Sequence, residues 1–316
     1  MRVATLLILL LGRAVGQNAP PEATFRSGTS LVRVDALALD GSRVLSGLRK
    51  DDFVILDDAA PQPILHFEVE NNHLDLLLLI DKSCSMMPVV AEIAVSAVEA
   101  LTVLREGDRV GVMLFDQKRD LVIQPTAKME EVAAALENAV RPEAIGGGTD
   151  INNAVLDAAR FLRRQPRTDA RRSILILTDN RSFKATKDST VVRELWEADA
   201  VLNALIFQSG FGRAVHRYRQ MTNPAALVFG LFLEANVNRI VEQTGGESLQ
   251  SGTPLESFRE MLERIRKRYS LHYRPPAAPA GQRRSIRVAL TAEVLRKHPG
   301  AKVLARRGYV PPGETP

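Results

Sequence analysis

Residues 76–86 read LLLLIDKSCSM, and this stretch decides the fold because it joins an apolar run to a polar loop. The run Leu76–Ile80 contains no polar side chain, which is typical of a parallel strand covered on both faces. The loop that follows carries Asp81, Ser83 and Ser85, whose side chains all end in oxygen. Loops at the carboxyl ends of parallel strands form the ligand-binding edge of an open sheet. We therefore expect a ligand site directly after this strand.

Two further loops carry oxygen-bearing side chains in comparable positions. Thr149 follows three consecutive glycines, which let the backbone approach a ligand closely, and it precedes a predicted helix. Asp179 comes just after the apolar strand Ser173–Leu177. Each loop alone is common in turns and helix caps. Their order, with buried strands between them, predicts that five residues converge on one point: Asp81, Ser83, Ser85, Thr149 and Asp179.

An all-oxygen ligand set indicates a hard divalent cation. Two carboxylates with hydroxyls and water suit Mg²⁺ better than a carboxylate-rich Ca²⁺ cage, with Mn²⁺ or Ca²⁺ as alternatives. We expect Ser83 and Ser85 to bind the ion directly, and the other three residues to bind it directly or through water. Two carboxylates only partly neutralise the ion, so a Glu or Asp of a protein partner can supply its last ligand. Lys82 would weaken cation binding unless its side chain points away.

Strands alternate with helices along the middle of the chain. This alternation predicts an α/β fold with a doubly wound, mostly parallel central sheet and helices on both faces. The expected domain spans residues 74–274, with further strands at Val110–Phe115 and Val201–Phe207. Helical spacing of apolar residues predicts its helices at about 88–104, 130–140, 150–164, 190–198, 237–243 and 255–268.

The segments on either side of this domain are β-rich. Residues 30–70 contain three strand-like stretches, and residues 282–312 contain two more after a proline-rich break at Pro275–Gly281. Neither segment is long enough for an independent α/β unit. We expect them to pack together as a small accessory β module.

The beginning of the chain resembles an export signal. Met1-Arg2 is followed by the apolar run Val3–Gly12 and by small residues suited to cleavage before Gln17. We expect residues 1–16 to be a signal peptide, residues 17–29 to be a flexible start, and the protein to reach the periplasm, the cell envelope or the medium. No later segment is predicted to cross a membrane. Cys84 is the only cysteine, so an intramolecular disulfide is excluded.

The net charge of +5 does not predict nucleic-acid binding. The basic residues are dispersed, and aromatic residues, which stack on bases in single-strand binding sites, make up only 5% of the chain. We expect no nucleic-acid partner.

On the three loops the chain resembles the von Willebrand factor A family. The matching residues are those of the expected cation site together with Met86, and the resemblance extends from about Leu74 to Tyr273. It implies a doubly wound sheet with a metal-ion-dependent adhesion site at its edge, and a binding protein without enzymatic activity. The chain departs from the family at Cys84 and Asn180, where glycine is usual, but neither change removes a coordinating oxygen.

A second, narrower resemblance covers the flanking segments. Gly47–Phe53 and Gln62–Ile64 near the start, with Tyr269–Tyr273 and Arg306–Tyr309 near the end, are similar to exported bacterial VWFA-related domain proteins common in Acidobacteria. That family has no settled biochemical activity, so this resemblance bears on architecture more than on function.

The sequence disfavours two enzymatic functions and leaves two other functions open. A dehalogenase-like phosphatase needs a second acid two residues after its Asp nucleophile, and Ser83 stands there. A Ser/His/Asp hydrolase is disfavoured because no G-x-S-x-G elbow is present and the histidines lie outside the three loops. Two alternatives stay open: a structural or assembly subunit whose cation only stabilises the loops, and a partner of AAA+ motor proteins in metal chelation or cofactor maturation.

Overall fold

The computed structural model describes residues 31–69, 72–83, 86–139, 149–167, 169–182, 186–207, 233–251, 253–279 and 281–311. From Leu31 onward the chain forms one compact unit. The expected signal peptide 1–16, the flexible start 17–29, Cys84, Ser85 and the three glycines before Thr149 lie outside the described residues.

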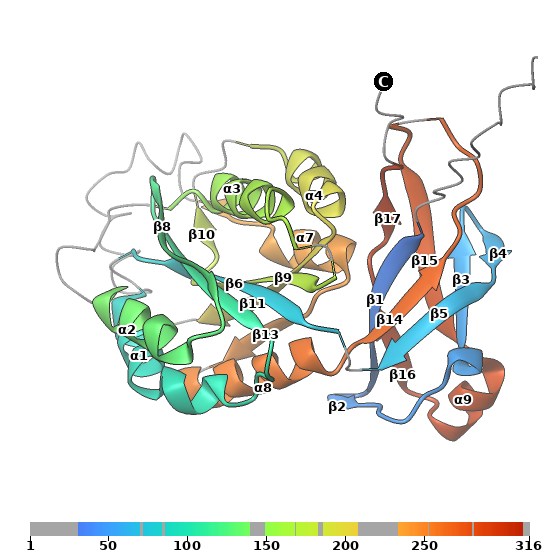
Figure 1. Cartoon of the computed structure of the whole chain (residues 1–316), viewed down its shortest axis with the longest axis horizontal. Coiled ribbons are helices and arrows are strands. Elements are labelled where there is room, and N and C mark those ends of the chain that lie inside the picture. Colours follow the sequence, from blue (N-terminus) through green and yellow to red (C-terminus); the bar gives the residue numbers. More distant parts are fainter. Residues whose placement is uncertain are drawn as a thin grey trace, which may run out of the picture. The chain divides into compact units, whose positions relative to one another are not determined.

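The middle of the chain builds a six-stranded central sheet (Figure 1). Neighbouring strands are parallel except for the last pair, which is antiparallel and closes one edge of the sheet. In spatial order the strands are β13 (Ser248–Ser251), β11 (Ala200–Phe207), β9 (Arg171–Thr178), β6 (Leu74–Asp81), β7 (Arg109–Phe115) and β8 (Arg119–Thr126). The predicted doubly wound, mostly parallel sheet is confirmed.

Helices cover both faces of this sheet. One face carries α1 (Met87–Leu101), α2 (Met129–Ala139) and α8 (Pro254–Arg266), whose apolar side chains share one core. The other face carries α3 (Ile151–Arg163), α4 (Asp188–Glu197) and α7 (Val237–Thr244) over a second core.

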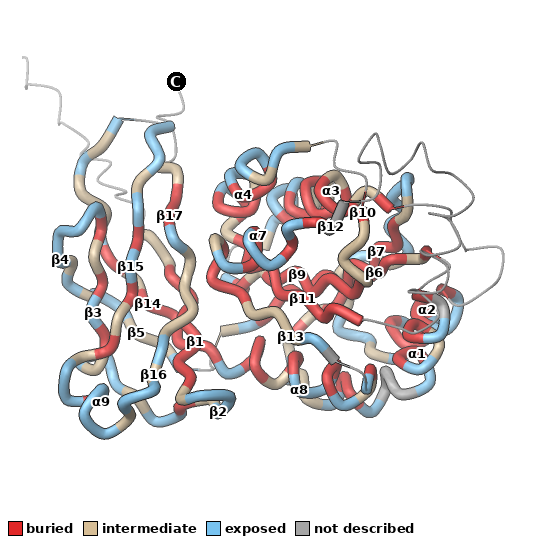
Figure 2. Tube along the Cα trace, turned by 180° about the vertical axis from the view of Figure 1, so that it is seen from behind, coloured by how far each residue is buried: buried red, intermediate tan, exposed pale blue. Residues whose placement is uncertain are grey.

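The apolar run of β6 explains why the strand is buried throughout (Figure 2). Leu76, Leu78 and Ile80 point into the first core, whereas Leu77 and Leu79 point into the second. Successive side chains of a strand face opposite sides, so a strand covered by helices on both faces needs apolar residues at every position.

No helix within the described residues is long and apolar enough to cross a membrane.

Two antiparallel sheets make up the accessory β module. The first has the order β16-β1-β14-β5, with β2 (Arg43–Val44) also paired to β1; its strands are Ala301–Leu304, Val32–Asp40, Tyr269–Tyr273 and Ile64–Val69. The second has the order β17-β15-β3-β4, with strands Gly308–Tyr309, Arg284–Leu290, Phe53–Asp57 and Ala60–Gln62. Apolar residues of both sheets share a third core. Strands from both flanking segments therefore combine into one module, as the sequence predicts.

Strand β14 differs from the expected boundary at residue 274. It pairs with β1 and β5 of the accessory module, not with the central sheet. The side chains of Tyr269, Leu271 and Tyr273 all point into the accessory core, which explains why this strand belongs there although it follows α8 directly.

Four short elements complete the described fold. They are η1 (Lys50–Asp52), α9 (Ala292–Lys297) and the paired strands β10 (Arg181–Ser182) and β12 (Leu233–Glu234).

A buried carboxylate joins four strands of the accessory module. Asp57, at the end of β3, is fully buried and accepts hydrogen bonds from Tyr273 Oη at 2.8 Å, Tyr309 Oη at 2.9 Å and Arg284 Nε at 2.7 Å. Burial and the bond to Asp57 raise the pKa of Tyr273, and they raise the pKa of Tyr309 to about 12. Both phenols therefore stay protonated as donors at neutral pH.

Candidate functional site

Asp81 is the last residue of β6, and its side chain is fully buried. Its carboxylate accepts hydrogen bonds from the backbone N–H of Ser83 at 3.0 Å and from Thr178 Oγ1 at 2.8 Å. Thr149 Oγ1 lies 3.5 Å from the same carboxylate, at the outer limit of a hydrogen bond. All these donors are neutral, so they orient the carboxylate without offsetting its charge.

A second carboxylate lies close to Asp81. Asp179 follows β9, is half-buried, and accepts a hydrogen bond from the backbone N–H of Arg181 at 3.2 Å. Burial and the neighbouring charge of Asp179 raise the pKa of Asp81 to about 7. A neighbouring negative charge disfavours the ionised form of a buried carboxyl. The geometry thus concentrates negative charge at the carboxyl ends of β6 and β9.

The structure brings together four of the five residues predicted from the sequence. Ser83 and Thr149 are nearly buried and lie against Asp81, and Asp179 is close enough to perturb its titration. The fifth, Ser85, lies outside the described residues. The oxygen-bearing side chains converge from the ends of β6 and β9 and from the start of α3.

Lys82 points away from this group of oxygens. Its ammonium group forms an ion pair with Asp120 at 2.8 Å and lies 3.9 Å from Asp116. Its backbone N–H donates to the carbonyl of Phe115 at 2.9 Å, which fixes the loop against β7. The positive charge beside Asp81 in the sequence therefore lies next to the carboxylates of Asp116, in the β7–β8 turn, and Asp120, at the start of β8.

The loop that carries Thr149 is fixed by Ser182. Ser182 Oγ donates to the carbonyl of Thr149 at 3.1 Å and accepts from the backbone N–H of Ile151 at 2.9 Å. Asp150 caps α3 by accepting from the backbone N–H of Asn153 at 3.2 Å. These bonds hold the hydroxyl of Thr149 at the start of a helix, as expected.

Sequence reasoning missed two contributors, Thr178 and Ser182. Thr178 Oγ1 donates to Asp81 and accepts from the backbone N–H of Asn180 at 3.1 Å, so it links two of the three loops. Its position immediately before Asp179, at the end of a buried strand, is a signal from which Thr178 could have been predicted. No comparable signal in the sequence marks Ser182.

The described residues contain no cluster of three His, Cys, Asp or Glu side chains of the kind that would hold a metal without hydroxyl ligands. The described histidines lie away from the three loops: His66 and His272 in accessory strands β5 and β14, His73 just before β6, and His298 after α9. His216 lies outside the described residues. A site here would therefore rest on two carboxylates and neutral hydroxyls.

Part of the chain matches a known protein family. Residues 76–182 match the family model of the von Willebrand factor type A domain, and no curated protein matches the chain significantly. Similar solved structures include a von Willebrand factor type A protein from Catenulispora acidiphila, with 13% identity, a TM-score of 0.46, and coverage of 85% of this chain and 76% of that one.

Two further structures are similar to parts of the chain. The conserved hypothetical protein BatB from Bacteroides thetaiotaomicron is 13% identical, with a TM-score of 0.45 and coverage of 61% of this chain and 97% of that one. Proximal thread matrix protein 1 from the mussel byssus, with a zinc-occupied MIDAS motif, is 16% identical, with a TM-score of 0.48 and coverage of 67% and 50%. The narrower resemblance to Acidobacteria-type proteins stays a prediction. The family match, which begins within β6, assigns residues 76–182 of this chain to a von Willebrand factor type A domain.

Proposed function

We propose that this protein is an exported binding protein whose von Willebrand factor type A domain holds one divalent cation, Mg²⁺ in the first instance. Asp81, Ser83, Ser85, Thr149 and Asp179 would supply the ligands, directly or through water. A Glu or Asp carboxylate of a protein partner would complete the coordination. The observation that carries the proposal is the fully buried carboxylate of Asp81, whose pKa is raised to about 7 by burial and by Asp179.

The donor set fits such an ion. Mg²⁺ is bound in proteins by one or two carboxylates with neutral oxygens and water. A cation beside Asp81 and Asp179 would offset the repulsion between the two carboxylates, which the neutral donors Ser83 N–H and Thr178 Oγ1 at Asp81 do not. The only basic side chain adjacent to Asp81 in sequence is held at Asp120, which supports cation access to this group.

Replacing Asp81 with Ala is expected to abolish Mg²⁺ binding in isothermal titration calorimetry. The change removes the carboxylate to which Ser83, Thr149 and Thr178 are all hydrogen-bonded. Asp51→Ala is the matched control: it removes an exposed carboxylate of the accessory module and should leave Mg²⁺ affinity within about twofold. Unchanged Mg²⁺ affinity in Asp81→Ala would contradict the proposal.

A second measurement separates a binding site from a purely structural ion. If a partner carboxylate completes the coordination shell, an acidic peptide should bind the Mg²⁺-loaded protein but not the protein in EDTA, and its amidated counterpart should bind neither. A pull-down from envelope extract in Mg²⁺ and in EDTA, with wild type and Asp81→Ala, then identifies the natural partner. Mg²⁺ binding with no EDTA-sensitive peptide or partner would favour the structural subunit. Cell fractionation separates the exported protein from a cytosolic partner of AAA+ proteins.

Replacing Thr178 with Val is expected to weaken Mg²⁺ binding by about tenfold, because groups that orient a metal ligand contribute to affinity without touching the metal. Val keeps the shape of the side chain but cannot donate to Asp81 Oδ2 or accept from Asn180. Calorimetry on the variant tests this, with Thr190→Val on the exposed surface of α4 as control. Equal affinities for the two variants would mean that Thr178 does not position Asp81.

A further inference from the structure

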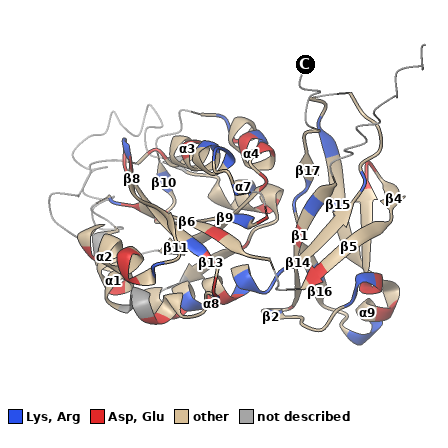
Figure 3. Ribbon diagram, in the orientation of Figure 1, with Lys and Arg blue, Asp and Glu red and all other residues tan. Residues whose placement is uncertain are grey.

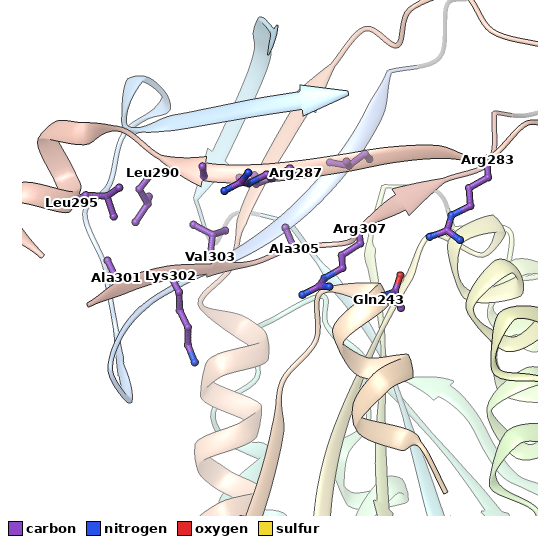
Figure 4. Close-up of a pocket in the computed structure, with 13 residues that line it drawn as sticks. Gln243, Arg283, Arg287, Leu290, Leu295, Ala301, Lys302, Val303, Ala305 and Arg307 are labelled. Atoms are coloured by element: carbon purple, nitrogen blue, oxygen red, sulfur yellow. The ribbon is translucent and has the colours of Figure 1, made fainter. Parts of the chain in front are cut away.

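The five-stranded sheet of the accessory module ends in two strands, β16 and β5 (Figure 1). Strand β16 lies beside β15 of the second sheet, and Leu290 and Val303 line the hollow of about 700 Å³ that these two strands border (Figure 4). Strand β5 has β14 as its only strand partner among the described residues. A further strand can therefore be added to this sheet at β5 and not at β16.

The hydrogen bonds of β1 show which residues of β14 bond to it. Strands β2 and β16 both pair with Leu39, so they lie on opposite sides of β1, and β14 lies on the side of β2. The carbonyl of Ala38 accepts from Leu45, just after β2, and so points to this side. Backbone groups alternate between the two edges of a strand, so Ala36 also bonds toward β14. Its register partner Tyr269 therefore bonds to β1.

The same alternation identifies the open backbone groups of β5. Because Tyr269 bonds to β1, its neighbour Ser270 bonds to β5, and the register partner Glu68 bonds back to β14. Phe67 and Val69, on either side of Glu68, therefore direct their N–H and C=O groups to the outer edge. No described residue is hydrogen-bonded to them there.

Strand β5 lacks the residues that usually protect a strand edge. The edge strands β4 and β8 contain Pro61 and Pro125, and proline and lysine are typical of edges that stay unpaired. Strand β5 contains neither, and Leu65 and Val69 are 42% and 39% exposed. A bulge at Leu65 limits regular pairing to the residues that follow it. This short stretch is an exposed edge with apolar side chains.

We propose that β5 pairs with β5 of a second copy of this chain, antiparallel about a two-fold axis at Phe67. The two Phe67 residues exchange both of their backbone hydrogen bonds. Val69 lies opposite Leu65 of the second copy, and His66 lies opposite Glu68 of the second copy. Each of these contacts occurs twice, because a two-fold interface uses the same surface of both copies.

The polar side chains of β5 favour this register and a second copy as the occupant. His66 is exposed, and neither His66 nor Glu68 forms a hydrogen bond or ion pair with a described residue. Glu68 is the only Asp, Glu, Lys or Arg of β5, so most of the strand is tan in Figure 3. Pairing about Phe67 supplies each Glu68 with an imidazole and each His66 with a carboxylate.

Other registers lose this complementarity. A shift by two residues sets Glu68 opposite Glu68, or His66 opposite His66, and like charges directly opposite are destabilising. A shift by one residue sets Phe67 opposite a residue whose backbone groups already bond to β14. The pairing uses no residue of the candidate cation site and does not depend on a cation.

Sedimentation equilibrium of the full chain in EDTA tests the proposal. We expect a reversible monomer–dimer equilibrium in the wild type that weakens by at least about tenfold in His66→Glu, because two attractive cross-strand pairs become repulsive. His66→Glu/Glu68→Gln removes the repulsion and should recover most of the affinity. Gln282→Glu, which adds one negative charge at an exposed position outside β5, and Asp81→Ala should both dimerise like wild type.

Disulfide cross-linking tests the register. With Cys84 replaced by Ser, His66→Cys and Glu68→Cys are prepared as two single variants. Across the interface the Cα atoms of residues 66 and 68 would be about 4.5 Å apart, whereas those of two equivalent residues would be about 8 Å apart. A disulfide needs a Cα separation below about 7 Å. Oxidation should therefore yield a covalent dimer from a mixture of the two variants and not from either variant alone.

Three results would each overturn the proposal: a wild type that stays monomeric throughout the concentration series, a dimer that His66→Glu does not weaken, or covalent dimers that form as readily from one cysteine variant as from the mixture. Hydrogen exchange on a monomeric wild type would then identify the alternative. Protection of the Phe67 and Val69 amides would mean that another segment of the same chain covers the edge. Fast exchange would leave the edge to a different protein.

Discussion

The Asp81→Asn variant is expected to be more stable than the wild-type protein in EDTA and to gain no stability from Mg²⁺. In the wild type, burial and Asp179 raise the pKa of Asp81 from 3.8 to about 7, so ionising this carboxyl at neutral pH costs the folded state free energy. A shift of this size corresponds to at most about 4 kcal/mol. An amide carries no charge and removes this cost, but it also removes the anionic ligand.

The sign of the pH dependence follows from the direction of the shift. The folded state holds the proton of Asp81 more tightly than the unfolded state does, so the wild type loses stability as pH rises from the unfolded pKa toward 7. The advantage of Asp81→Asn in EDTA should therefore grow, by up to roughly 3 kcal/mol, between about pH 5 and about pH 8. Above that range the difference should level off.

Chemical denaturation at both pH values, with and without Mg²⁺, measures this effect. Asp51→Asn is the matched control, because the same change at an exposed carboxylate of the accessory module should neither stabilise the protein nor alter its response to Mg²⁺. If Asp81→Asn is less stable than wild type in EDTA at high pH, the carboxylate is stabilised by contacts other than those described. If Mg²⁺ still stabilises the variant, the cation is bound elsewhere.

The Asp57→Ala variant is expected to lose about 3–5 kcal/mol of folding free energy, the range for removing one partner of a buried charged pair. The change leaves the Arg284 guanidinium and the hydroxyls of Tyr273 and Tyr309 without their shared acceptor. Because these residues sit on β15, β14 and β17, a single substitution disconnects the strands around β3.

Thermal and chemical unfolding of Asp57→Ala measure the loss. Asp51→Ala, a few residues away and exposed, should change stability by less than about 0.5 kcal/mol. Asp57→Asn should fall between the two, since an amide oxygen still accepts from a hydroxyl but does not pair with Arg284. Equal stability of Asp57→Ala and Asp51→Ala would contradict the role assigned to this carboxylate.

The central domain could be predicted from the sequence because its signals are local. The apolar runs Leu76–Ile80 of β6 and Ile174–Leu177 of β9 have no polar residue to mark a solvent face, and β11 has only the buried Asn203. The helices between these strands repeat apolar residues at helical spacing. The pairing of strand β14 was harder to predict. Its sequence predicts a strand, but its partners β1 and β5 come from a segment about 200 residues earlier in the chain.

The candidate site was predictable in outline for a different reason. Parallel strands bring their carboxyl ends to one edge, so Asp81 and Asp179 had to approach each other once the sheet was recognised. The environment of Asp81 could not be predicted in the same way. Its contact with Thr178, the clamp by Ser182 and the turn of Lys82 toward Asp120 depend on side-chain directions that no spacing rule supplies.

Because β1 and β5 pair with β14, the accessory module is discontinuous in sequence, and the central domain is inserted between its two halves. The first half of the accessory module is synthesised early, yet β3 can pair with β15 only after the whole central domain has been made. Until then, β1, β3 and β5 present open edges, which are prone to pair with other chains. The central domain, whose strands and helices are contiguous in the chain, can fold first and shorten the effective loop between the two halves. This topology therefore predicts that the middle of the chain folds first and that the accessory module is completed last, when β14 and β15 reach β1 and β3.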